Sequence, residues 1–222
     1  ALRTYGDQRF ELITVASCVQ EWLKKDFSRE STLVLNGVDE TWFSFSADRK
    51  QRSLRSLKKP FRILIEGNPQ SPWKNIAEAL EIVRGLSGVE VFMVSNGERT
   101  EKPHGVNRFF HQVTFSEMQG LYRRCDLLLK TSKLESFYLP PLEMMSCGGL
   151  CVVADIPGGR DYLRDEENVL LYRLGDILHA RDQIKRLMHD EELRERLRQG
   201  GLRTAAQFSW DESLKKFSQL VR

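Results

Sequence analysis

Two glutamates, Glu135 and Glu143, flank a double proline in the stretch ESFYLPPLE (135–143). Pro140 or Pro141 suits the first position of a helix, because proline lacks the N–H group that this position leaves unused. Glu143 would then fall in the first helical turn, where the positive end of the helix dipole favours a carboxylate. Capping alone produces the same pattern, so the spacing by itself leaves a structural and a chemical interpretation open.

The chemical interpretation is a hydroxyl-binding site beside an anion site. Backbone N–H groups in a first helical turn have no partner within the helix and attract phosphate. Carboxylates instead accept hydrogen bonds from hydroxyls, and each charge-assisted bond contributes roughly 1.5–3 kcal/mol. A ligand with a central diphosphate and hydroxylated rings on both sides is a nucleotide sugar. Lys74, at the start of a helix expected over 74–86, would supply positive charge to the diphosphate.

The composition is that of an ordinary globular protein of one large or two small domains. The chain has 222 residues, of which 41% are hydrophobic, and its net charge of +3 does not indicate a nucleic-acid binder. No Cys-x-x-Cys pair occurs, so we expect buried reduced thiols, no metal site and no cofactor. The four cysteines are Cys18, Cys125, Cys147 and Cys151. Because the chain begins with Ala1, we expect it to be a piece of a longer protein.

Apolar runs alternate with amphipathic segments, which predicts an α/β fold. We expect a Rossmann-like parallel sheet with helices on both faces, followed by a C-terminal helical segment. The expected strands are 10–17, 31–39, 61–67, 89–95, 106–113, 126–132, 150–156 and 168–172. The expected helices are 18–27, 74–86, 116–125 with Ser116 as N-cap, 141–147, and most of 176–222. An apolar stripe of Leu214, Phe217 and Val221 is assigned to core or interface packing.

In an open parallel sheet, ligands bind beyond the carboxyl ends of the strands. Three unusual loops are expected there: EGNPQSPWKN (66–75), the stretch around 135–143, and DIPGGRDYL (155–163). The segment DRKQRSLRSLKKP (48–60) is different, since it has six basic residues and one acid. It predicts a solvated linker, and without interleaved aromatic residues a nucleic-acid-binding arm is disfavoured.

The stretch ESFYLPPLEMMSCGGLCVVADIPGGRDYLRDEENVLLY (135–172) resembles the donor-binding core of family-four retaining glycosyltransferases. These enzymes have the GT-B architecture of two Rossmann-like domains. Their pattern of two acids, a glycine, a valine-rich strand and a paired glycine is matched by Glu135, Glu143, Gly148, Val152, Val153, Gly158 and Gly159. EGNPQSPWKN resembles the family's phosphate loop, and NGVD (36–39) with Phe43 resembles its interdomain crossing.

The resemblance implies a role for each candidate residue. Glu143 would bind the nucleotide ribose, Glu135 would meet the donor sugar as the catalytic residue, and Lys74 would bind the diphosphate. The other implied substrate-binding residues are Gly67, Asn68, Ser136, Phe137, Tyr138 and Leu139. The implied partners are a nucleotide-diphosphate sugar donor and a saccharide or lipid-linked acceptor in polysaccharide or glycoconjugate synthesis. The implied location is the cytoplasm, including the inner face of the membrane.

The same resemblance divides the chain into three parts. Residues 1–43 would be the end of an acceptor domain with the interdomain crossing, and 44–60 the basic linker. Residues 61–222 would be the nucleotide-sugar-binding domain with its C-terminal helices. The N-terminal domain of the same protein would then be missing from this chain. Half a cleft cannot position both substrates, so we expect this chain to bind donor without transferring sugar. An exposed apolar patch near Trp42 and Phe43 would mark the missing domain.

Three positions depart from the family pattern. Asn68 stands where the family usually has arginine, which removes one expected phosphate contact. Ser136 and Tyr138 replace two usual glycines, and their side chains are expected to narrow the pocket. The form YLPPLEMM (138–145) resembles a subgroup that builds surface polysaccharides, some members with deoxysugar donors such as rhamnose.

Other classes of function remain to be compared with a glycosyltransferase. A non-catalytic nucleotide-sugar-binding module is the main alternative, favoured by Asn68 and disfavoured by the presence of both acids. A dinucleotide-dependent oxidoreductase would need a Gly-x-Gly-x-x-Gly turn after a strand, and the sequence has none. A metal-dependent transferase of the other major architecture would usually show an Asp-x-Asp pair, which is also absent from the sequence.

Overall fold

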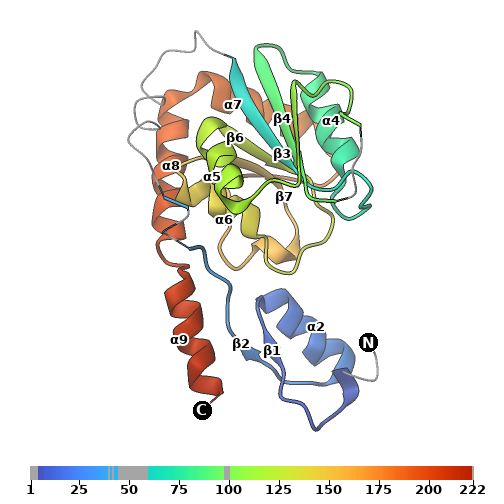
Figure 1. Cartoon of the computed structure of the whole chain (residues 1–222), viewed down its shortest axis with the longest axis vertical. Coiled ribbons are helices and arrows are strands. Elements are labelled where there is room, and N and C mark those ends of the chain that lie inside the picture. Colours follow the sequence, from blue (N-terminus) through green and yellow to red (C-terminus); the bar gives the residue numbers. More distant parts are fainter. Residues whose placement is uncertain (1–4, 40, 42, 45–59, 98–100, 222) are drawn as a thin grey trace.

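Six parallel strands form the sheet at the centre of the computed structural model, which describes residues 5–39, 41, 43–44, 60–97 and 101–221 (Figure 1). The strands are β3 (Phe61–Glu66), β4 (Val89–Ser95), β5 (Arg108–His111), β6 (Leu127–Lys130), β7 (Leu150–Ala154) and β8 (Leu170–Tyr172). Their spatial order is β5-β4-β3-β6-β7-β8, and each neighbouring pair is parallel. This is the doubly wound order of a Rossmann-like sheet, so the predicted fold class is confirmed.

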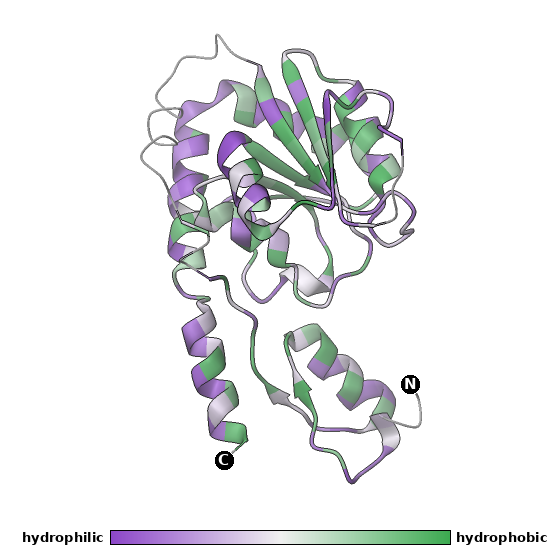
Figure 2. Cartoon of the chain, in the orientation of Figure 1, coloured by the Kyte–Doolittle hydropathy of each residue, from purple (hydrophilic) through white to green (hydrophobic). Residues whose placement is uncertain are grey.

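The inner strands are apolar along most of their length, because helices cover both of their faces. Ile63 and Leu64 of β3, Leu128 of β6 and Val152 of β7 are all fully buried. Figure 2 shows these strands as the most hydrophobic part of the chain, while the surrounding helices alternate between hydrophobic and hydrophilic residues. The strand ranges predicted from apolar runs agree with the structure to within a few residues.

The helices lie in two layers that follow the order of the strands. On one face, α4 (Ile76–Arg84) packs with α7 (Ile177–His189). On the other, α6 (Leu139–Ser146) packs with α5 (Phe115–Arg124) and α8 (Glu191–Ala205). The loops that leave β3 and β6 therefore turn to opposite faces of the sheet, and in a doubly wound fold the crevice between two such loops is the usual place for a ligand.

The N-cap of helix α5 lies two residues earlier in the chain than predicted. Ser116 was expected to be its N-cap, but the cap is Thr114, whose side-chain oxygen accepts from the Glu117 N–H at 3.3 Å. The Glu117 carboxylate accepts in return from the Thr114 N–H at 2.7 Å. This reciprocal capping box satisfies two backbone N–H donors at once.

The N-terminal segment folds as a small unit beneath the sheet domain (Figure 1). It consists of β1 (Ile13–Thr14), α2 (Ser17–Phe27) and β2 (Thr32–Leu33), with the two short strands parallel. The strands predicted over 10–17 and 31–39 are much longer than this. Strand length depends on pairing, and each of these strands has one partner among the described residues.

Two segments that are distant in sequence run side by side between the unit and the sheet domain. The Val38 N–H donates to the Phe208 carbonyl at 2.8 Å, and the Trp210 N–H donates to the Val38 carbonyl at 3.1 Å. Gly37 permits this approach, because a Cβ there would lie 2.3 Å from the Ser209 carbonyl carbon. The chain then continues into α9 (Trp210–Leu220), which extends away from the sheet domain beside this crossing (Figure 1).

The apolar surface lies elsewhere than predicted. Phe43 is only 3% exposed, because it packs against Phe115 and Tyr122, so the expected patch at this residue is wrong. Trp42 and the basic linker over 45–59 lie outside the described residues.

The apolar stripe of α9 is exposed. Leu214, Phe217 and Val221 do not contribute to the core of this chain, so their assignment to core packing is wrong and only interface packing remains. In the N-terminal unit, Phe10, Ile13 and Trp22 are exposed as well. Exposed apolar side chains therefore gather on the two parts that lie outside the sheet domain.

Candidate functional site

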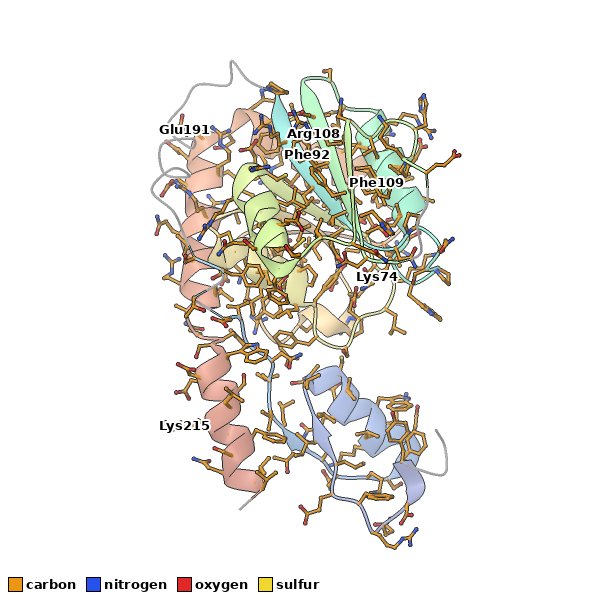
Figure 3. The ribbon with its side chains drawn as sticks, in the orientation of Figure 1. Lys74, Phe92, Arg108, Phe109, Glu191 and Lys215 are labelled. Carbon is orange, nitrogen blue, oxygen red and sulfur yellow. The ribbon has the colours of Figure 1, made fainter. Side chains whose placement is uncertain are left out.

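The predicted site residues lie on the loops that follow β3 and β6 and in helix α6. These neighbouring strands mark the point where the strand order of the sheet reverses, the usual ligand site of a doubly wound fold. Gly67, Asn68 and Lys74 follow β3, and the stretch 135–143 follows β6. Figure 3 shows Lys74 at the end of the sheet domain that faces the N-terminal unit.

The loop after β3 requires a glycine and uses Asn68 to shape its turn. Gly67 has a φ of 152°, and a Cβ there would lie 2.9 Å from Ile76 and 3.0 Å from Lys74. The Asn68 side-chain oxygen accepts from the Gln70 N–H at 3.0 Å. Asn68 therefore organises the loop and adds no positive charge to it.

Lys74 and Glu135 form an ion pair across the crevice. The Lys74 Nζ lies 2.7 Å from Glu135 Oε1, which also accepts from the Ser132 hydroxyl at 2.8 Å. Lys74 was predicted at the start of its helix, but α4 begins at Ile76, with Asn75 as its N-cap in the left-handed conformation. Lys74 therefore extends from the loop itself, where it can reach the segment after β6.

A second ion pair lies behind the first and was not predicted. The Lys130 side chain is only 1% exposed, and its Nζ donates to the Glu66 carbonyl at 2.9 Å and to the Glu66 carboxylate. Burial raises the pKa of Glu66, but the Lys130 ammonium outweighs it and brings this pKa below its ordinary value. The available signal was a charged residue at the last position of each apolar strand, FRILIE and LLLK.

Glu143 lies further along helix α6 than predicted. The helix begins at Leu139, so Pro140 and Pro141 occupy its second and third positions. Neither proline is the first helical residue, and Glu143 lies in the second turn, which corrects both expectations. The early helical positions need no N–H group within the helix, so both prolines are tolerated there.

The Glu143 carboxylate is held by a tyrosine. Its Oε2 accepts from the Tyr122 hydroxyl at 2.8 Å. Burial raises the pKa of Glu143 to about 7, and the Tyr122 hydrogen bond and the Lys130 charge only partly oppose that rise, while the Glu66 charge adds to it. Carboxyl groups whose pKa is strongly raised by burial are common in binding and catalytic sites.

The backbone before α6 offers fewer donors than the sequence argument assumed. The Leu139 N–H donates to the Phe137 carbonyl at 2.8 Å, and the Tyr138 N–H donates to the Gly158 carbonyl at 3.1 Å. Within the described ranges, no backbone hydrogen bond uses the N–H groups of Ser136 and Phe137. These two groups, rather than those of the helical turn, can meet an anion.

The side chains around these N–H groups point mostly inward. Phe137 and Tyr138 are buried, and Leu139 is half-buried, while Ser136 is exposed. Tyr138 therefore does not narrow an open pocket, which corrects that expectation. Gly158 lies against this loop on the other side. Only glycine fits there, because a Cβ at this position would lie 2.2 Å from the Glu135 carbonyl oxygen.

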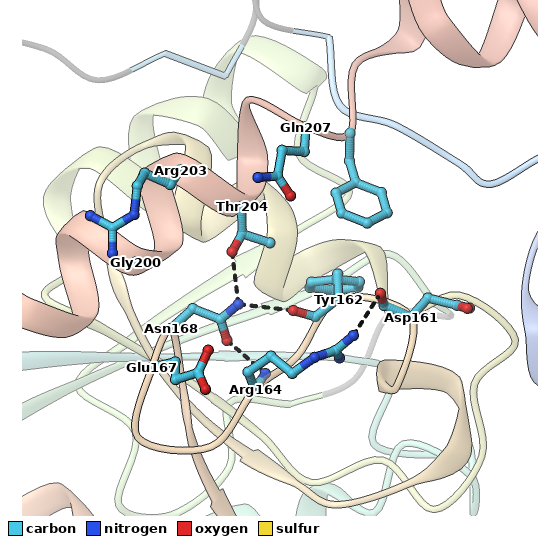
Figure 4. A pocket seen from close by; sticks show the side chains of 10 residues that line it. Asp161, Tyr162, Arg164, Glu167, Asn168, Gly200, Arg203, Thr204 and Gln207 are labelled. Carbon is cyan, nitrogen blue, oxygen red and sulfur yellow. Dashed lines mark hydrogen bonds between the residues drawn. The ribbon is translucent and has the colours of Figure 1, made fainter.

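A pocket of about 290 Å³ lies between the turn 161–168 and α8 (Figure 4). Its wall is tied together by Asn168, whose side-chain nitrogen donates to the Tyr162 carbonyl and the Thr204 hydroxyl, each at 2.8 Å. None of the predicted site residues lines this pocket. It is therefore separate from the crevice between the loops after β3 and β6.

Two features are absent from the described part of the chain: a metal-binding cluster and a membrane-spanning helix. No three His, Cys, Asp or Glu side chains gather there closely enough to hold a metal ion. None of the helices described is both long and apolar enough to cross a lipid bilayer.

The family follows from a comparison with known sequences. The family model described as "Glycosyl transferases group 1" matches residues 58–204, which include the whole sheet and every predicted site residue. The chain belongs to this family. The predicted resemblance to GT-B glycosyltransferases is therefore confirmed.

This chain matches only part of the length of individual group 1 glycosyltransferases. A D-inositol 3-phosphate glycosyltransferase from Salinispora tropica is 35% identical over 108 residues, which are 49% of this chain and 22% of that protein. The protein of the same name from Corynebacterium jeikeium is 29% identical over 208 residues, which cover 83% of this chain and 49% of that protein. This chain thus spans at most about half of these relatives.

A solved structure confirms the fold of this group 1 glycosyltransferase. The Anabaena protein HepE, solved in complex with UDP-glucose, superimposes with a TM-score of 0.81 at 18% sequence identity. The match covers 95% of this chain and 63% of HepE. It includes the N-terminal unit as well as the sheet domain, since the sheet domain alone would not reach this coverage.

Proposed function

We propose that this chain is the donor-binding part of a glycosyltransferase and binds a nucleotide-diphosphate sugar. One observation carries the proposal: Lys74 and Glu135 pair across the loops that leave β3 and β6, where the strand order reverses, and Glu143 lies in the helix that follows. A cation and two carboxylates near these strand ends suit a ligand with a diphosphate and hydroxylated groups.

The diphosphate is assigned to Lys74 and to the N–H groups of Ser136 and Phe137. Lys74 is the more exposed of the two lysines that face Glu135, and its ion pair with Glu135 can open toward a ligand. The two N–H groups precede α6, so the positive end of that helix points the same way. Gly67 and Asn68 shape the opposite wall of the site.

The two carboxylates are assigned to the two ends of the ligand. Glu143 is held by Tyr122 through Oε2, which leaves Oε1 to accept from a ribose hydroxyl. Glu135 is held through Oε1, which leaves Oε2 for the donor sugar as the proposed catalytic carboxylate. A substitution at Glu135 should then affect sugar binding more than nucleotide binding.

We assign residues 1–43 to the end of an acceptor domain, and α9 to an element that packs on it. Two parallel strands of two residues are too small a sheet to be stable alone. Exposed apolar residues on α9 and in the N-terminal unit would be covered by such a domain. The acceptor would be a saccharide or a lipid-linked saccharide, and this chain alone would transfer no sugar.

The main alternative is a nucleotide-sugar-binding module without catalysis. Asn68 in place of the family's arginine favours it, because a donor site with less positive charge stabilises a leaving diphosphate less well. The presence of Glu135, paired and held in the crevice, favours the enzyme.

Titration calorimetry with UDP, UDP-glucose, GDP-mannose and dTDP-glucose tests the binding proposal. At 100 times the dissociation constant, a true ligand also stabilises the folded chain by about 2.7 kcal/mol in a thermal-shift assay. If none of these compounds binds, the proposed function is wrong. Transfer from the bound donor by the full-length protein, with none by the Glu135→Gln variant, separates the enzyme from the binding module.

A further inference from the structure

Lys130 is buried at the carboxyl end of β6, directly behind the proposed donor site. The other three residues of this strand are leucines, and all four are buried. A buried ammonium is costly unless ion pairs and hydrogen bonds compensate for its lost hydration. Packing alone therefore does not explain a lysine at this position.

Three donors converge on one oxygen of Glu135. Lys74 Nζ lies 2.7 Å from Oε1 and the Ser132 hydroxyl lies 2.8 Å from it, while Lys130 Nζ lies 3.9 Å away. The two lysines differ in freedom, since the side chain of Lys74 is 30% exposed and that of Lys130 only 1%. Lys74 can turn to a ligand, whereas Lys130 is held in place by its bonds to Glu66.

A bound diphosphate would compete with Glu135 for Lys74. The ligand carries two negative charges on its phosphates and the carboxylate carries one, so the ammonium is drawn toward the diphosphate. Glu135 then loses its nearest cation at the moment when its other oxygen meets the sugar. Glu66 adds negative charge nearby, and after burial it is a further cause of the raised pKa of Glu143.

We propose that Lys130 is a positioning residue for Glu135: it is the fixed counter-ion that keeps this carboxylate in place when Lys74 turns to the diphosphate. Glu66 orients the Lys130 ammonium and balances its charge. The inference rests on the proposed function, because it needs a diphosphate at Lys74. It assigns Lys130 a larger effect on the sugar end of the ligand than on the nucleotide end, where its charge and that of Glu66 act on Glu143 in opposite directions.

The test compares a nucleotide sugar with its bare diphosphate in titration calorimetry. The donor is whichever of UDP-glucose, GDP-mannose and dTDP-glucose binds most tightly. The main variant is Lys130→Met combined with Glu66→Gln, which removes both charges and leaves no unpaired carboxylate. Glu66→Gln alone retains the Lys130 charge near Glu135, and Lys133→Met removes an exposed lysine of the same loop as a matched control.

The double variant should bind the nucleotide sugar about tenfold more weakly, with the bare diphosphate changed by less than about twofold. Lys133→Met should change neither affinity. Unchanged sugar-nucleotide affinity in the double variant overturns the inference, and so does an equal loss for both ligands, which would indicate a general structural role. Failure of the unaltered chain to bind any of the three donors instead overturns the proposed function.

A crystal structure of the unaltered chain with the bound donor gives a second test that does not depend on the folding of a variant. The expected structure has Lys74 on the diphosphate and Glu135 still within 4 Å of Lys130, close to the 3.9 Å of the unliganded chain. A Glu135 carboxylate that follows Lys74, or that leaves Lys130 altogether, would contradict the proposal.

Discussion

Replacement of Glu143 tests the energetics of the site most directly. Burial raises the pKa of this carboxyl from its ordinary value of 4.5 to about 7. Between these pH values the folded chain holds a proton that the unfolded chain has released, so the free energy of unfolding falls as the pH rises. At about 1.4 kcal/mol per pKa unit, the charged carboxylate lowers the stability by roughly 3 kcal/mol above pH 7.

The Glu143→Gln variant removes this charge but retains an oxygen that can accept from Tyr122. Urea unfolding followed by circular dichroism should show the variant more stable than the unaltered chain by roughly 2–3 kcal/mol at pH 8. The difference should shrink as the pH falls and vanish near pH 4.5. The same variant should bind the nucleotide sugar more weakly by roughly 1–3 kcal/mol, because its amide replaces a charged acceptor.

Glu166→Gln is a control for which the expected change in stability has the opposite sign. The Arg186 hydrogen bond, more than any other contact, holds the pKa of Glu166 below its ordinary value, so removing this carboxylate should lower the stability near neutral pH. Glu166 lies outside the proposed donor site, and ligand affinity should not change. A Glu143→Gln variant that is less stable than the unaltered chain at pH 8, or equally stable at every pH, would refute the argument.

Other measurements test the assigned roles. UDP-glucose binding should weaken below pH 7, by up to about tenfold per pH unit, and this dependence should disappear in Glu143→Gln, because the charged carboxylate accepts from the ribose hydroxyl more strongly than the protonated one. Lys74→Ala should reduce affinity for a nucleoside diphosphate far more than for the nucleoside in calorimetry; an equal effect on both would remove Lys74 from the phosphate site. Glu135→Ala should weaken the nucleotide sugar and spare the bare diphosphate, and an equal loss for both would place Glu135 outside the sugar site. The purified chain should show no sugar transfer in a radiolabelled-donor assay, and robust transfer without an added domain would contradict the assigned incompleteness.

Much of the fold was predictable because it depends on local patterns. Buried parallel strands need continuous apolar runs such as FRILIE and VEVFMVS, and these predicted β3 and β4 closely. The alternation of such runs with amphipathic helices determined the fold class. The short strands of the N-terminal unit were overestimated, because an apolar run cannot show how many partner strands are present. The N-cap of α5 was missed because Ser116 and Thr114 are both good caps and only the reciprocal bond to Glu117 decides between them.

For the candidate site too, the sequence indicated the types of the residues, whereas their contacts are seen only in the structure. The types and spacing of Glu135 and Glu143 indicated hydroxyl binding at a strand end, because residue type decides which groups can accept or donate. Their partners came only from the folded chain. Lys74 lies 61 positions before Glu135, and Tyr122 lies 21 positions before Glu143. Sequence spacing carries no information on contacts that the sheet order brings together.

The amino-acid sequence alone indicated the class of the fold, the family and the candidate residues for binding a diphosphate and hydroxyls. Only the tertiary structure decided which lysine lies exposed on the loop and which lies buried behind it, since Lys74 and Lys130 have the same chemistry and differ only in burial. It also decided that the prolines of α6 remove N–H donors from the expected anion site. Burial and the distances between charges arise from packing among distant segments, so ionisation and affinity are properties of the folded chain.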